Sequence, residues 1–213
     1  MSALCAVFRR DRAAVDPGCA RAILDAQRAR GPDAANVWAE GAIAIGHGLF
    51  ATTPEDRLGA QPWKTSEGRV VVALDGRIDN REEIAAWTGA RLNDVPDVGP
   101  VAAAYEAWGG VCGATAGGFC GDRVGRAVGE LIAARDVVGG GLSFSEEGRE
   151  VRCASHAGAV RGDGRRGCAR ASMRWRCSWW SGTWSAPQTL LEGVRAVAPG
   201  ETRRFGGRAR GAW

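Results

Sequence analysis

Apolar blocks separated by charged or turn-forming residues predict strands along the first 110 residues of the chain. Residues Ala3–Phe8 form an apolar run that ends at a group of charges, which is typical of a buried strand. Two further segments, Ala42–Phe50 and Arg69–Leu74, are rich in β-forming residues. Between them, Thr52–Trp63 contains prolines and a glycine and is predicted to be a loop.

A helical period appears between these strands. Pro17 opens a helical pattern that ends before Gly31. The positions at i, i+3, i+4 and i+7 spacing are Ala20, Ile23, Leu24 and Gln27. Arg81–Trp87 and Val101–Trp108 predict two shorter helices. The alternation of strands with helices indicates a domain that mixes α and β structure.

The pattern weakens after residue 109. Leu131–Ala134 is a predicted strand, but residues 117–129 hold five glycines and little apolar surface to offset the entropy of ordering. Residues 157–187 follow neither a helical nor a strand period, because arginine, glycine, cysteine and tryptophan are interspersed there. An apolar pattern returns at 189–200, before a Pro-Gly turn.

The charge distribution supports a division of the chain. Residues 157–213 contain 11 arginines and three acidic residues, a formal charge of +8, so the first 156 residues carry −4 of the total of +4. We predict a domain at 1–156, an Arg/Gly/Trp-rich low-complexity segment at 157–187 and a remnant of the domain's C-terminal end at 188–213.

Composition excludes several classes of protein. Apolar residues make up 45% and charged residues 24%, so the chain can form a core. No apolar run approaches the roughly 18 residues of a membrane span, and charges follow the first apolar stretch too soon for a secretory signal. The seven cysteines include no pair at zinc-knuckle spacing, and only His47 and His156 are available to join them. We expect no metal site, no membrane contact and a cytoplasmic location with reduced thiols.

Eight short sequence segments, spread over nearly the whole chain, resemble segments of one protein family and occur in the same order as in that family. Together they are similar to the N-terminal, class II glutamine amidotransferase domain of asparagine synthetases. The resemblance implies an α+β, N-terminal-nucleophile (Ntn) hydrolase-like fold, a four-layer αββα sandwich, here with a degraded C-terminal third. The strings are MSALCAVFRRD, RARGPDA, GHGLF, GAQPW, LDGRIDNREE, PDVGPVAAAYEAWG, AARDVVG and LLEGVRAVAPGE.

The resemblance also implies a catalytic nucleophile. In this family an N-terminal cysteine attacks the side-chain amide of glutamine, and its own α-amino group serves as the base. The matching cysteine is Cys5, which Met1 to Leu4 precede. Cys5 therefore has a free amine only if residues 1–4 are removed. The alternative for Cys5 is a small buried residue on a central strand.

Several pocket positions depart from the family pattern. The family's oxyanion hole is an Asn side chain plus a Gly N–H, where this chain has Asp75 and Gly76. A carboxylate repels the developing oxyanion, and the loss of one donor alone costs a factor of about 10²–10³. Leu49 replaces the arginine that holds the substrate carboxylate, and Arg77 replaces an acid. Asp97 remains at the position that pairs with the substrate ammonium, although it also suits a helix cap.

These departures lead to two hypotheses about function. The first is an asparagine synthetase (glutamine-hydrolysing)-like protein, reduced to the amidotransferase half, whose glutamine hydrolysis is weak or lost. The second is a non-catalytic scaffold or peptide-binding domain of a lasso-peptide cyclase. The strings GHGLF, TTPEDR and DGRIDNREE resemble macrolactam synthetase homologues that take their amine from the peptide itself. The partners are then glutamine, or a separate synthetase chain or precursor peptide.

The synthetase half is not recognisable in this sequence. Its Ser-Gly-Gly-x-Asp-Ser pyrophosphate loop does not occur. We therefore expect no cofactor in this chain, with ATP and Mg²⁺ implied only for the missing synthetase domain.

Two residue patterns have competing interpretations. His47 lies where the family often has a histidine, and a hydrogen-bonded structural role is favoured over a catalytic one. Arginine and tryptophan between Arg161 and Trp184 form a pattern found on surfaces that bind single-stranded nucleic acid. We favour loss of pattern there, by drift or a shifted reading frame, over a nucleic-acid partner.

Overall fold

The structure of the protein is a computed structural model that describes residues 1–89, 95–108, 119–127, 129–137, 140–162 and 188–206. Most of the low-complexity segment predicted at 157–187 lies outside these residues. The domain boundaries proposed from the sequence therefore stay predictions. Within the described part of the chain, no helix is both long enough and apolar enough to cross a lipid bilayer.

The described strands form two antiparallel sheets. The first sheet has the strand order β10-β8-β9-β1-β3-β2, and the second has the order β11-β7-β6-β5-β4. The strands of the first sheet are β1 (Ala3–Arg9), β2 (Ala34–Glu40), β3 (Ile43–Leu49), β8 (Ser143–Glu147), β9 (Glu150–Ala154) and β10 (Val194–Ala196). Those of the second are β4 (Trp63–Lys64), β5 (Val71–Ile78), β6 (Phe119–Ala127), β7 (Glu130–Arg135) and β11 (Thr202–Phe205).

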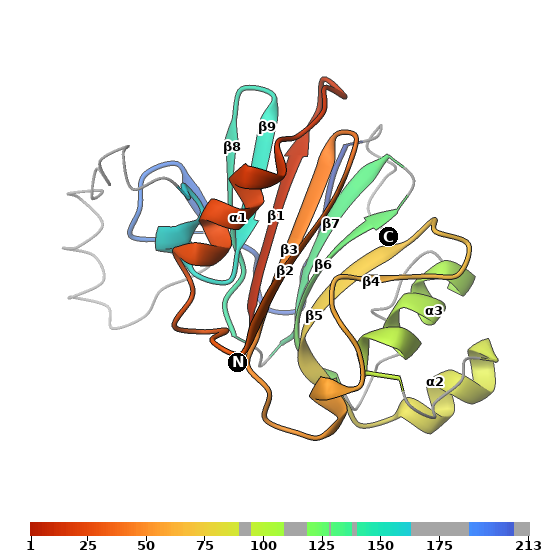
Figure 1. Ribbon diagram of the computed structural model, residues 1–213. Coiled ribbons are helices and arrows are strands. Elements are labelled where there is room, and N and C mark those ends of the chain that lie inside the picture. Colours follow the sequence, from red (N-terminus) through yellow and green to blue (C-terminus); the bar gives the residue numbers. More distant parts are fainter. Residues whose placement is uncertain (90–94, 109–118, 128, 138–139, 163–187, 207–213) are drawn as a thin grey trace.

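Helices cover the outer faces of the two sheets (Figure 1). Helix α1 (Pro17–Asp25) packs on β1 and β3, and α3 (Val98–Trp108) packs on β4 and β5 beside α2 (Arg81–Thr88). Short 3₁₀ turns, η1 (Glu55–Arg57) and η2 (Ala157–Ala159), lie in the connections. This is the four-layer αββα sandwich that the family resemblance implies.

Strand β1 is apolar throughout because both of its faces are buried. Leu4, Ala6 and Phe8 face the core between the two sheets, where they meet residues of β5 and β8. Ala3, Cys5 and Val7 face the layer formed by α1. A strand in the middle of the sandwich therefore shows a continuous apolar run instead of alternation.

Some elements differ from the sequence-based expectation. Helix α1 ends at Asp25, well before Gly31, and the following residues form turns. Helix α3 begins at Val98 and includes Pro100, which is tolerated because first-turn N–H groups have no partner within the helix. Strand β2 was not predicted, since it is an edge strand whose side chains are mostly exposed.

The glycine-rich segment around residue 120 is a correction to the sequence analysis. Residues 117–129 offered too little apolar surface for a predicted element, yet Phe119–Ala127 forms strand β6. It pairs with β5 along one edge and with β7 along the other. The backbone N–H and C=O groups of β6 form hydrogen bonds with both neighbouring strands. This pairing stabilises the strand without requiring a large apolar surface on its side chains.

The C-terminal part of the described chain completes both sheets. Strand β10 adds to the first sheet beside β8, and β11 adds to the second beside β7. Val194, Val197 and Phe205 are fully or almost fully buried there. Residues 188–206 are thus an integral part of the sandwich core, whereas 163–187 and 207–213 lie outside the described residues.

Candidate functional site

The start of the chain meets strand β5 at one end of the space between the sheets. The backbone N–H of Ser2 donates a hydrogen bond to Oδ1 of Asp75 at 2.6 Å, across 73 positions of sequence. The Ser2 hydroxyl accepts a hydrogen bond from the N–H of Phe50 at 3.1 Å, just after β3. Ser2 is buried, so strands β1, β3 and β5 together fix its position beside the Asp75 carboxylate.

Asp75 has a carboxyl group under opposing influences. Burial raises its pKa above the ordinary value, because the interior penalises the charged form. The hydrogen bond from Ser2 and the charge of the chain's amino terminus act in the other direction. The carboxylate thus finds its stabilising donors in the N-terminal segment of the chain itself.

Cys5 lies on the opposite face of the first sheet from Ser2. Its side chain is fully buried under α1, and its thiol donates a hydrogen bond to the carbonyl oxygen of Ala20 at 3.3 Å. Burial raises the pKa of the thiol to about 12. The structure does not bring Cys5 to Asp75, because residues 2 and 5 of an extended strand point to opposite faces. The nucleophilic role suggested by the resemblance stays a prediction.

Leu49, Gly76 and Arg77 border the same end of the sandwich. Leu49 ends β3 and is partly buried, and it has no group that could hold a carboxylate. Gly76 and Arg77 are exposed on β5. The guanidinium of Arg77 pairs with Asp79 at 2.9 Å, but both side chains are more than half exposed, so this pair adds little stability.

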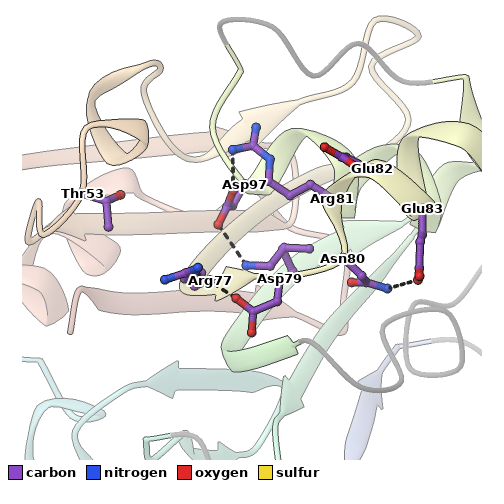
Figure 2. A pocket seen from close by; sticks show the side chains of 9 residues that line it. Thr53, Arg77, Asp79, Asn80, Arg81, Glu82, Glu83 and Asp97 are labelled. Carbon is purple, nitrogen blue, oxygen red and sulfur yellow. Dashed lines mark hydrogen bonds and ion pairs between the residues drawn. The ribbon is translucent and has the colours of Figure 1, made fainter.

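Asp97 lines a cavity of about 620 Å³ next to this end of β5 (Figure 2). Its Oδ1 pairs with Nη1 of Arg81 at 3.0 Å, and its Oδ2 accepts the backbone N–H of Ile78 at 3.0 Å. Oδ2 is therefore hydrogen-bonded within the chain, and Oδ1 has an ion-pair partner but no hydrogen bond among the described residues. The carboxylate connects the end of β5 to the start of α2. The two roles suggested by the sequence, an ammonium partner or a helix cap, stay predictions.

His47 is buried on β3 between the two sheets. Burial is the main cause that lowers its pKa to about 4, and a hydrogen bond with the backbone of Leu74 opposes this change. The ring is therefore neutral at physiological pH. These contacts favour the structural role expected for this histidine, since a base with so low a pKa abstracts protons poorly.

Ser2 is the site residue that sequence reasoning missed. The family resemblance drew attention to the cysteine, but Ser2 is the residue at the head of β1 that contacts Asp75. A signal was present in the sequence. The buried strand was predicted to begin at Ala3, and the family's nucleophile lies at the very start of the chain. The resemblance predicts the nucleophile at Cys5, which is in mid-strand, whereas Ser2 directly precedes that strand.

Two solved structures share this architecture. Glutamine phosphoribosylpyrophosphate amidotransferase from B. subtilis, complexed with ADP and GMP, has a TM-score of 0.59 and 17% identity, over 74% of this chain and 42% of that one. A structure of the allosteric regulatory enzyme of purine biosynthesis has a TM-score of 0.66 and 17% identity, over 96% and 47%. This chain spans less than half the length of either structure. The likeness establishes the α+β, Ntn amidotransferase-type fold.

Sequence comparison gives the family. Among curated proteins, no sequence matches this chain. The family model described as a glutamine amidotransferase domain matches residues 1–210, which is nearly the whole chain. The strand order and the helical layers agree with this match. The chain therefore belongs to the glutamine amidotransferase domain family.

Proposed function

We propose that this chain is the amidotransferase-type domain of an asparagine-synthetase-like protein and that its hydrolysis of glutamine is weak or absent. The contact between Ser2 and Asp75 carries the proposal. When a nucleophile attacks the amide of glutamine, the carbonyl oxygen becomes negatively charged and needs hydrogen-bond donors. A carboxylate at that place accepts hydrogen bonds and repels the charge.

The state of the cysteine supports the same conclusion. With a thiol pKa of about 12, Cys5 carries a thiolate in only about one molecule in 10⁴ at pH 8. Its Sγ is enclosed between Ala20 and Gly46, and a substrate cannot reach it while α1 is packed on β1. A chain that keeps Cys5 in this position has no reactive thiol there.

The groups that hold substrate are also changed. Free glutamine carries a carboxylate and an ammonium group, and the family resemblance assigns these to Leu49 and Asp97. The side chain of Leu49 is neutral, and the Asp97 carboxylate is already engaged by Arg81 and Ile78. Binding of glutamine would have to break the Asp97 contacts without compensation from an arginine at position 49.

Glutaminase activity is measured directly as glutamate release from glutamine. We expect no turnover above background from the purified chain, and no change on Cys5→Ala. Cys153→Ala is the matched control, because Cys153 is an equally buried free cysteine on the neighbouring strand β9. Turnover that Cys5→Ala abolishes and Cys153→Ala leaves intact would refute the proposal. Intact-mass measurement shows whether the active material begins at Cys5.

A second candidate is a non-catalytic binding domain for a peptide-cyclising synthetase. Two observations favour it. Both sheets are formed and share a packed core, which a binding domain requires, whereas the pocket residues depart from the family pattern that catalysis requires. The test is a titration of the purified chain with a peptide-cyclising synthetase chain and with a precursor peptide. Complex formation by size-exclusion chromatography supports the scaffold role, and no binding to either partner rejects it.

A further inference from the structure

We propose that a groove at the opposite end of the sandwich from Ser2 binds an acidic segment of a partner polypeptide. The groove has a volume of about 770 Å³. Four arginines, two glutamates and the edges of Phe8 and Phe205 are among the residues that line it. The arginines are Arg10, Arg12, Arg203 and Arg204, and the glutamates are Glu40 and Glu146.

The groove is separate from the site at Asp75. Strand β1 starts beside Ser2 at one end of the molecule and ends at Arg9 at the other (Figure 1). Its seven residues span about 20 Å at roughly 3.3 Å per residue. Phe8 and Arg10 at the far end of the strand contribute to the groove. The inference therefore does not depend on whether the domain hydrolyses glutamine.

The lining of the groove is basic, and three of its four arginines are paired with carboxylates: Arg10 with Glu146, Arg203 with Glu201 and Arg204 with Glu130. Four arginines against two glutamates give its lining a formal charge of +2. Arg10 pairs with Glu146, and Arg204 pairs with Glu130, each at 3.3 Å. Both arginine side chains are still more than two-fifths exposed. Guanidinium groups bind carboxylates through several parallel donors, which suits a second carboxylate from outside.

Among the four arginines, Arg12 gives the strongest argument for a ligand. It has a φ of 61°, in the left-handed region that residues with a side chain rarely adopt. Among the described residues, no ion pair or side-chain hydrogen bond involves its guanidinium. A glycine or an asparagine at this position would relieve the strain of the positive φ. Strained backbone conformations that persist are found preferentially at functional sites. Arg12 therefore brings to the groove a positive charge that has no ion pair within the described part of the chain.

The floor and rim of the groove favour a peptide over a nucleic acid. Phe8, Ile43 and Phe205 also line the groove, and although they are almost fully buried in the core, what they expose there is apolar. Glu40 and Glu146 on the rim repel a continuous phosphate backbone. Separate carboxylates on a polypeptide can instead reach the arginines and avoid the glutamates.

The test is calorimetric titration with a capped octapeptide, Gly-Glu-Phe-Glu-Gly-Leu-Glu-Gly, in about 50 mM salt, where screening is moderate. We expect the natural chain to bind it and the peptide with lysine at each glutamate position not to bind. Arg12→Gly removes the charge and relieves the strained φ, so the variant stays folded. It should weaken binding by about three- to tenfold.

Arg57→Ala is the matched control, because Arg57 is an exposed arginine on η1 and does not line the groove. We expect binding by this variant to equal that of the natural chain. Thermal unfolding of each variant confirms that it is folded. Absence of binding by the natural chain, equal binding by Arg12→Gly, or tighter binding of an eight-nucleotide single-stranded DNA than of the acidic peptide would each overturn the proposal.

Discussion

Burial controls the chemistry of single residues in this protein. Asp75 and His47 lie near the same end of the space between the sheets, and burial acts on both by disfavouring the charged form. For Asp75 this raises the pKa, and for His47 it lowers the pKa to about 4. Cys5 lies on the other face of the sheet, and burial raises the pKa of its thiol to about 12.

The depressed pKa of His47 predicts how stability changes with pH. Between pH 6.5 and about 4 the unfolded chain takes up a proton that the folded chain does not, so the free energy of unfolding falls as the pH is lowered. His47 alone contributes up to about 3 kcal/mol over this window. His47→Gln cannot titrate. We expect its urea unfolding curves to lose that part of the pH dependence, and an unchanged slope would contradict the assignment.

Arg12 gives a second prediction at this scale. Glycine adopts a φ of 61° without the steric cost that arginine has there. We expect Arg12→Gly to leave the free energy of unfolding unchanged or to raise it by up to about 1 kcal/mol. The measurement is chemical denaturation, with Arg57→Gly as the comparison on a residue outside the strained region. A loss of more than about 1 kcal/mol would show that Arg12 makes a structural contact instead.

At the scale of elements, close packing fixes which face of β1 meets which layer. A Cβ added at Gly46 on β3 would lie 2.6 Å from Sγ of Cys5 and 2.8 Å from Cδ1 of Leu24. Strands β1 and β3 and helix α1 therefore approach so closely that position 46 has no room for a methyl group. This packing keeps Cys5 under α1 and leaves Ser2 beside β5.

Gly46→Ala tests that packing. We expect it to destabilise the fold by about 1–3 kcal/mol in thermal or chemical unfolding. The cost should be smaller in a Cys5→Ala background, because the Sγ is then absent and Leu24 can shift its side-chain end. Gly141→Ala is the control, since its added Cβ would be 3.7 Å from the nearest atom. Equal costs with and without Cys5 would mean that the thiol does not occupy this place.

The connection from β5 to α2 gives a second prediction at the element scale. Asp97→Asn keeps an acceptor for Ile78 but removes the negative charge that pairs with the half-buried Arg81. We expect a loss of about 1–2 kcal/mol in the free energy of unfolding. Asp79→Asn is the matched control, because the Arg77–Asp79 pair is exposed and should cost less than about 0.5 kcal/mol.

At the scale of the whole molecule, one core joins the two sheets. It combines residues of β1, β3, β5, β7, β8, β9 and β11, which come from both halves of the described chain. The ring centroids of Phe144 on β8 and Phe205 on β11 are 5.3 Å apart. The guanidinium carbon of Arg203 lies over the Phe144 ring, 4.5 Å from its centroid. The C-terminal strands are therefore part of the same cooperative unit as the N-terminal ones.

Phe144→Ala tests this unity. The ring is fully buried, so its removal should lower the free energy of unfolding by about 3–5 kcal/mol. We expect far-UV circular dichroism and tryptophan fluorescence to report one coincident transition at a lower midpoint. Phe50→Ala, which truncates an exposed ring, should leave the midpoint nearly unchanged. Two separate transitions would show that the sheets unfold independently.

The sequence predicted elements well where local signals were strong. The apolar run of β1, the Pro17 start of α1 and the segments that became β3 and β5 all depend on neighbouring residues. It predicted less where an element depends on distant partners. Strand β6 is rich in glycine and exists because β5 and β7 lie beside it. For the same reason the edge strand β2, with its exposed side chains, gave no clear pattern.

The candidate site divides in the same way. Sequence alone determined the residue types, with an aspartate at 75, a leucine at 49 and a basic C-terminal segment. The family resemblance predicts an asparagine and an arginine at the first two of these positions. Only the tertiary structure decided which residue faces Asp75, because Ser2 and Asp75 are 73 positions apart. Ser2 precedes β1 of the first sheet, and Asp75 lies in β5 of the second. The tertiary structure also decided that Cys5 is enclosed under α1. The sequence indicates the alternation of side chains along a strand, but only the packed structure shows which layer covers each face.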